Sequence, residues 1–111
     1  MICQFGDVVV VRFPFTDLSV AKPRPAVAVS SLTFSADHGH TILAMITTGA
    51  GSTWPSDVRI EDLAAAGLQH SSVIRWKLFT LVNEQLAVRI GRLAETDRAR
   101  LTDSSAAVFG R

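Results

Sequence analysis

The first half of the chain contains short apolar runs separated by glycine, proline and polar residues. Residues 5–13, 25–30 and 41–47 are each rich in valine, isoleucine or alanine. Short runs of this kind, bounded by turn residues, are typical of β-strands. The Asp-His-Gly-His sequence at residues 37–40 favours a turn. We therefore predict three strands, with this turn just before the third.

The middle and later segments continue the strand pattern around one helical turn. Residues 61–66 (Glu-Asp-Leu-Ala-Ala-Ala) favour a helical turn, which Gly67 is expected to end. The pair Asn83 and Glu84 favours a further turn. The strand-like segments lie at residues 58–60, 72–76, 78–82 and 86–91. The second and third of these segments are either separate strands or one long bent strand.

The apolar period changes from Leu93 onward and becomes helical. The positions that share one helical face are Leu93, Asp97, Leu101, Ser104 and Val108. Thr96 or Asp97 is expected to cap this helix. Six or seven short strands, one helical turn and this final helix predict a mainly β fold, either a small barrel or a sandwich. The final helix would cover one opening of the barrel.

Composition restricts the class of protein. The chain has 111 residues, which predicts one domain over residues 1–111. Apolar residues make up 48% and charged residues 19%, so disorder is excluded. The apolar runs are far shorter than the roughly 20 residues of a spanning helix. The single cysteine, Cys3, cannot form an internal disulfide, and no secretory signal is visible, so we expect a cytoplasmic protein.

Residues that could ligate a metal are few and scattered. The three histidines are His38, His40 and His70, and no further ligand cluster appears at metal spacing. We therefore expect solvent-exposed turn histidines and no metal. No glycine-rich phosphate-binding motif is present, so no nucleotide cofactor is expected either.

The remaining candidates for chemistry are arginines and hydroxyl residues at predicted strand ends. They are Arg24, Thr47, Thr48, Ser72 and Arg75. Arg24 stands between two prolines, which hold it in an extended backbone. Guanidinium groups and hydroxyls suit a phosphate group and can stabilise the charge of a phosphorane. Arginines at strand ends are also common partners in surface ion pairs, so residue types alone leave both interpretations open.

Five segments resemble, in order, the MazF/PemK family of toxin endoribonucleases from type II toxin–antitoxin systems. The first two are residues 5–10 (Phe-Gly-Asp-Val-Val-Val) and 22–30, which contain an Arg-Pro pair. The others are residues 42–48, ending in two threonines, residues 67–75, ending in Val-Ile-Arg, and residues 90–93. Together they span nearly the whole chain.

The resemblance implies an SH3-like barrel with a C-terminal helix, a homodimer and a partner antitoxin. It also implies metal-independent cleavage of single-stranded RNA, in which the 2′-hydroxyl attacks the adjacent phosphate. The family arginine falls on Arg24 and the family threonine on Thr47, and Arg75 matches an arginine that some members use near the scissile bond. These members have an aspartate two residues later, where this chain has Lys77. Asp17 is the nearest carboxylate in the first loop that could substitute as a base.

Base recognition is expected in the loops at residues 14–23 and 48–57. Besides the catalytic candidates, the residues expected to contact RNA are Thr16, Asp17, Lys22, Thr48, Trp54, Ser72 and Lys77. Trp54 can either stack on a base or seal the barrel. A cationic RNA groove also predicts an antitoxin with an acidic or disordered tail.

The sequence leaves two alternative functions open. Lys77 motivates a catalytically impaired RNA-binding module on the same fold. An SH3-like protein-interaction domain is disfavoured, because such grooves are lined by aromatic residues and this chain has no tyrosine and 7% aromatic residues.

Overall fold

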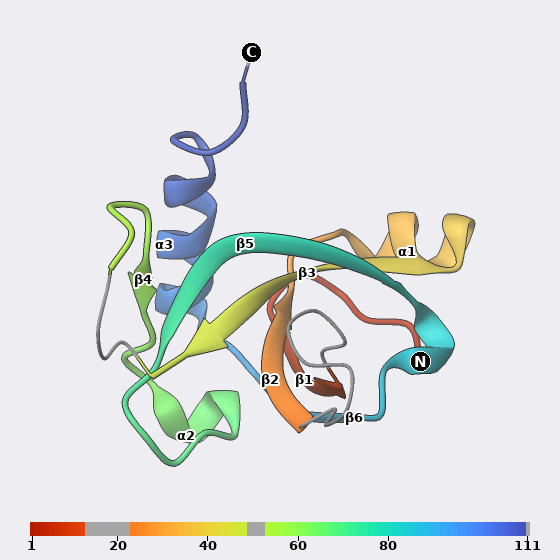
Figure 1. Ribbon diagram of the computed structural model, residues 1–111, viewed down its shortest axis with the longest axis horizontal. Coiled ribbons are helices and arrows are strands. Elements are labelled where there is room, and N and C mark those ends of the chain that lie inside the picture. The colour runs from red at the N-terminus through yellow and green to blue at the C-terminus, as the bar shows by residue number, and fades with distance from the viewer. Residues whose placement is uncertain (13–22, 49–52, 111) are drawn as a thin grey trace.

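The structure is a computed structural model that describes residues 1–12, 23–48 and 53–110. The described residues form one six-stranded sheet in the order β4-β5-β3-β2-β1-β6, in which every neighbouring pair is antiparallel. The sheet curls into a half-barrel, and β5 arches across it (Figure 1). The strands are β1 (Asp7–Arg12), β2 (Pro23–Ala28), β3 (His40–Thr47), β4 (Val58–Arg59), β5 (Val73–Val82) and β6 (Val88–Arg92). The predicted strands are therefore confirmed.

The two faces of the sheet bury separate apolar clusters. Side chains alternate between the faces of a strand, so residues paired across strands share a face. Val8 lies opposite Val27, and both belong to the cluster that packs against the C-terminal helix. Val9 lies opposite Ala26, and both belong to the cluster that contains Cys3. The uninterrupted valines of β1 are thus explained by burial on both faces.

The longest strand bends at a bulge. Leu78 lies opposite Ala44, whereas Arg75 lies opposite Met45, so the register shifts between these two pairs. Trp76 and Lys77 therefore have no residue directly opposite on β3. Such an irregularity bends a strand and re-aims its side chains. Of the two alternatives for residues 72–82, separate strands or one long bent strand, β5 confirms the second.

A helix that the sequence pattern did not predict lies at residues 32–38 and includes the first two residues of the turn predicted at 37–40. Helix α1 (Leu32–His38) is capped by Ser31, whose hydroxyl accepts a hydrogen bond from the N–H of Phe34 at 3.0 Å. Gly39 ends it with a φ of 66°, a conformation that favours glycine. The chain does turn at Gly39, as predicted, but this turn ends a helix that the sequence pattern did not predict.

The helical turn predicted before Gly67 is confirmed as α2 (Leu63–Ala66). Gly67 has a φ of 74°, and the Leu68 N–H donates to the Leu63 carbonyl at 2.9 Å. A Cβ atom at Gly67 would collide with the carbonyl group of Ile90 on β6. Gly67, the first residue after α2, therefore packs directly against β6 of the sheet.

The C-terminal helix is α3 (Glu95–Ser105), and the short 3₁₀ helix η1 (Asn83–Gln85) forms the turn predicted at Asn83. Leu101 is fully buried against the sheet, and Ser104 accepts a hydrogen bond from Trp76 Nε1 at 2.9 Å. Neither Thr96 nor Asp97 caps the helix, because Ala94 precedes its first turn. Asp97 lies in the helix interior.

The buried carboxylate of Asp97 ties α3 to the segment before α2. It accepts hydrogen bonds from the N–H groups of Glu61 and Asp62 at 3.0 to 3.2 Å and from Arg100 at 2.7 Å. Burial alone would raise the pKa of Asp97, but these donors hold it below its ordinary value. No described helix is both long and apolar enough to cross a membrane.

Candidate nucleic-acid site

Four of the predicted site residues line one surface hollow of about 300 Å³. Arg24 comes from the start of β2, Thr47 and Thr48 from the end of β3, and Ser72 from the residue before β5. Pro25, Ile46 and Leu68 supply apolar walls. The hollow thus presents one guanidinium and three hydroxyls, which is a donor set suited to a phosphodiester.

The strand register explains why Arg24 and Thr47 meet. Ala26 lies opposite Met45, so Arg24 and Thr47 each stand two residues beyond this pair, on the same face of their strands. Thr47 in turn lies opposite Val73 on β5. Three strands therefore converge at this end of the sheet, and the hollow lies where β2 and β3 stop pairing.

The segment at residues 67–72 closes one side of the hollow and is fixed at both ends. Gly67 is pressed against Ile90 at its start. At its end, Ser72 Oγ donates to the His70 carbonyl at 2.7 Å, and the Ser72 carbonyl accepts from the Ile60 N–H at 3.0 Å. Arg59 donates to Ser71 Oγ at 3.0 Å. These contacts give Ser72 a structural role within the hollow.

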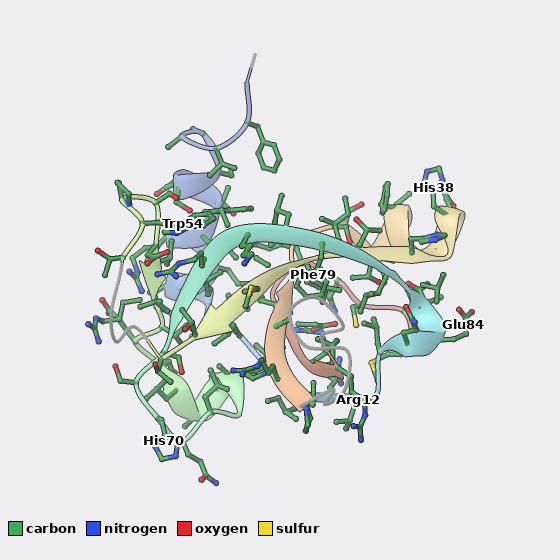
Figure 2. All side chains as sticks on the ribbon, viewed as in Figure 1. Arg12, His38, Trp54, His70, Phe79 and Glu84 are labelled. Atoms are coloured by element: carbon green, nitrogen blue, oxygen red, sulfur yellow. The ribbon has the colours of Figure 1, made fainter. Side chains whose placement is uncertain are left out.

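Two residues of this segment were not predicted as site residues. Gln69 and His70 line the same hollow as Arg24, and both also line an adjoining shallow hollow that shares Arg24 and Pro25. His70 is exposed, as predicted, but it lies beside the candidate site. Figure 2 shows His38 at the opposite end of the molecule from His70.

Arg75 does not line this hollow and instead forms an ion pair that sequence analysis missed. Its Nε donates to Asp57 Oδ1 at 3.1 Å, and its Nη2 donates to Asp57 Oδ2 at 2.9 Å. The side chains are 16% and 9% exposed. The hydrogen bond from Arg75 holds the pKa of Asp57 below its ordinary value, and the same bond raises the pKa of Arg75.

Trp54 lies over this ion pair. The guanidinium carbon of Arg75 is 5.3 Å from the centre of the indole ring, which is a cation–π distance. The Trp54 N–H donates to Asp57 Oδ2 at 3.0 Å, and its carbonyl accepts from the Asp57 N–H at 2.9 Å. Trp54 is 40% exposed, so it does not seal the barrel.

The other predicted RNA contacts are distributed differently. Lys77 is exposed in the bulge of β5 and does not line the Arg24 hollow. Thr16, Asp17 and Lys22 lie outside the described residues. Within residues 1–12, 23–48 and 53–110, no three His, Cys, Asp or Glu side chains gather where they could hold a metal ion.

Comparison with known proteins identifies the chain's relatives. Residues 4–109 match the family described as PemK-like, MazF-like toxin of type II toxin–antitoxin system. A probable endoribonuclease MazF of Mycolicibacterium smegmatis is 36% identical over 89 residues, which cover 79% of this chain and 80% of that protein.

Solved structures of similar proteins share the fold. MazF from Deinococcus radiodurans superposes with a TM-score of 0.75 at 16% identity, covering 100% of this chain and 99% of that one. An endoribonuclease from a mycobacterial species, solved in complex with its cognate antitoxin, gives a TM-score of 0.72 at 16% identity and covers 96% and 91%. This likeness confirms the predicted mainly β architecture with its C-terminal helix.

Proposed function

This chain belongs to the family of PemK-like, MazF-like toxins of type II toxin–antitoxin systems, and we propose that it is the endoribonuclease of such a system. Its substrate is single-stranded RNA, which it cleaves at internal phosphodiester bonds without a metal ion. The endoribonuclease name of its mycobacterial relative supports this activity. We further propose that residues 1–111 act as one domain in the cytoplasm.

The RNA supplies its own nucleophile in this proposal. The 2′-hydroxyl attacks the adjacent phosphorus, the bond to the 5′-oxygen breaks, and the products are a cyclic phosphate and a 5′-hydroxyl. Negative charge accumulates on the phosphorane in the transition state. Arg24 stabilises this charge by its fixed guanidinium donors, and Thr47 orients the scissile phosphate by a hydrogen bond.

The observation that carries this proposal is the convergence of Arg24 and Thr47 at one end of the sheet. Residues 23 apart in sequence occupy matching register positions on two strands and line one hollow with Thr48 and Ser72. Pro23 and Pro25 flank Arg24 and restrict its backbone. A donor fixed before the substrate arrives requires little reorganisation during the reaction.

The experiment is incubation of the purified chain with a long single-stranded RNA of mixed sequence in the presence of EDTA. We expect discrete cleavage products that carry cyclic phosphate and 5′-hydroxyl ends. Intact RNA after prolonged incubation with excess folded protein would contradict the proposed activity.

A second candidate is an RNA-binding module without cleavage. Lys77 cannot accept a proton as a carboxylate does, and the Arg75 guanidinium is already paired with Asp57. Under this alternative, single-stranded RNA would bind to the protein with measurable affinity and remain intact in the EDTA experiment.

We also propose a homodimer and an antitoxin partner. Exposed apolar side chains such as Leu78, Val88 and Phe109 support self-association. A solution mass near that of one chain, measured by light scattering at micromolar concentration, would contradict the dimer.

The antitoxin is proposed to place an acidic, disordered tail over the Arg24 hollow, where its carboxylates replace phosphate. A partner that binds elsewhere and leaves cleavage intact would contradict this mode of inhibition.

A further inference from the structure

The proposed cleavage requires a group that removes the proton of the 2′-hydroxyl, and the described carboxylates near the site are poorly suited to it. Asp57 is bound at both oxygens by Arg75, and its pKa is held low by that pair. Asp97 is fully buried and accepts hydrogen bonds from three donor groups, on Glu61, Asp62 and Arg100. Neither lines the Arg24 hollow.

His70 has the position and the chemistry that these carboxylates lack. It lines both hollows that Arg24 lines, and the first of these also contains Thr47 and Ser72. Imidazole is the side chain that exchanges a proton most readily near neutral pH. The geometry points to His70 as the general base of RNA cleavage. This inference rests on the proposed function.

The backbone of His70 is held as a catalytic group requires. Its carbonyl accepts the Ser72 hydroxyl at 2.7 Å, and its segment is anchored by Gly67 at one end and by the Ile60–Ser72 hydrogen bond at the other. No hydrogen bond to the His70 ring is found among the described residues, and Figure 2 shows the residue at the edge of the molecule, where it is exposed to solvent. The charged groups around it are Arg24 from β2 and Arg59 from β4, which reaches Ser71.

The step balances without a further reactant. Neutral His70 takes the proton of the 2′-hydroxyl while the 2′-oxygen bonds to phosphorus. The bond between phosphorus and the 5′-oxygen then breaks, and the 5′-oxygen takes a proton from water or from the imidazolium. No oxidant, reductant or metal takes part. The guanidinium of Arg24 stabilises the charge of the phosphorane.

The test is single-turnover cleavage of a mixed-sequence RNA transcript from about pH 5 to 9, using the full chain and three variants. The variants are His70→Ala, His70→Gln and the matched control His38→Ala, which removes an exposed imidazole at the other end of the molecule. Thermal melts accompany each variant, and His70→Gln decides the outcome if His70→Ala fails to fold. Affinity for a single-stranded DNA oligonucleotide, which lacks the 2′-hydroxyl, reports binding without cleavage.

We expect the wild-type rate to rise with pH across the range in which imidazole loses its proton. Both His70 variants should cleave about 100-fold or more slowly, lose this rise, keep their DNA affinity within about threefold, and recover part of their rate when free imidazole is added. His38→Ala should match the wild type. A folded His70→Gln protein with wild-type rate and pH profile would overturn the assignment and leave the proposed function intact. A wild-type protein that binds but never cleaves RNA would overturn the proposed function and this inference with it.

Discussion

The guanidinium of Arg75 and the carboxylate of Asp57 form a two-point ion pair, with donor–acceptor distances of 3.1 and 2.9 Å. Two parallel N–H···O contacts fix the plane of the guanidinium, which a single contact does not. The positive charge of Arg75 is thereby largely neutralised before any RNA arrives. A phosphate group that reaches Arg75 must compete with Asp57.

Asp57→Asn is expected to tighten the binding of single-stranded nucleic acid. The substitution removes a negative charge that repels phosphate and releases the Arg75 charge for the backbone. We expect affinity for a DNA oligonucleotide to rise by about two- to fivefold. The slope of log affinity against log salt should steepen by about 0.7, which corresponds to one additional phosphate contact. Arg75→Ala should weaken binding and cleavage together. An unchanged salt slope in Asp57→Asn, measured by fluorescence anisotropy, would place Arg75 outside the RNA path.

Trp54 is expected to stack on a base. Stacking contributes about 1–3 kcal/mol per base, so Trp54→Ala should weaken RNA binding by about tenfold while Trp54→Phe retains most of the affinity. Trp54 is exposed and Trp76 is 6% exposed, so RNA should quench the Trp54 fluorescence alone. A Trp76→Phe variant that keeps the quenching provides the control. Quenching that survives in Trp54→Phe would contradict the stacking role.

Asp97 is expected to make folding pH-dependent. Its pKa is lower in the folded chain than in the unfolded chain, so its contribution is complete above the ordinary carboxyl value and is lost as pH falls through the folded value. Asp97→Asn leaves the N–H groups of Glu61 and Asp62 poorly paired, and should lower the free energy of unfolding at neutral pH by about 1–3 kcal/mol. In thermal melts, the difference in stability between the wild type and Asp97→Asn should shrink as the pH decreases. A constant difference down to about pH 2 would show that Asp97 acts without its charge.

Gly67→Ala is expected to damage both stability and the hollow. An alanine must adopt a φ near 74° and push its Cβ against Ile90, whereas Gly39→Ala meets a φ of 66° and open space. The left-handed conformation alone costs an alanine roughly 1–2 kcal/mol. The loss in free energy of unfolding in Gly39→Ala measures that cost. The loss in Gly67→Ala should be larger by at least about 1 kcal/mol, because the Cβ also collides with Ile90. Chemical denaturation gives both values. Equal losses would mean that the segment at residues 67–72 relaxes freely.

Local sequence patterns predicted the strands because burial on two faces produces valine-rich runs, as in β1. They predicted α2 because Gly67 marks its end. Helix α1 was missed because its seven residues show no apolar period. The sequence features that mark this helix are its N-cap, Ser31, and its C-cap, Gly39. They are separated by the seven residues of the helix. The helix cap was misplaced because Asp97 satisfies N–H groups of another segment, a contact that only tertiary structure creates.

The candidate site was predictable in part. Arg24 and Thr47 were found through family resemblance, and strand register then explains their proximity. The Asp57–Arg75 pair joins residues 18 apart across a bend, and no local pattern encodes it. His70 was treated as a solvated turn residue because its position beside Arg24 follows from the packing of α2 on β6, which spacing along the chain does not reveal.

Arg24 is proposed to stabilise the phosphorane during RNA cleavage. Arg24→Ala should cleave about 100-fold or more slowly, Arg24→Lys should recover little of this loss because it lacks the planar fork, and Thr47→Val should lose less because it removes one neutral hydrogen bond. All three proteins should melt like the wild type and bind DNA oligonucleotide to within about tenfold.

The most direct measurement is single-turnover cleavage of RNA by Arg24→Ala at saturating protein, beside its thermal melt. We expect a normal melt with cleavage slowed about 100-fold or more. A normal melt with cleavage at the wild-type rate would contradict it.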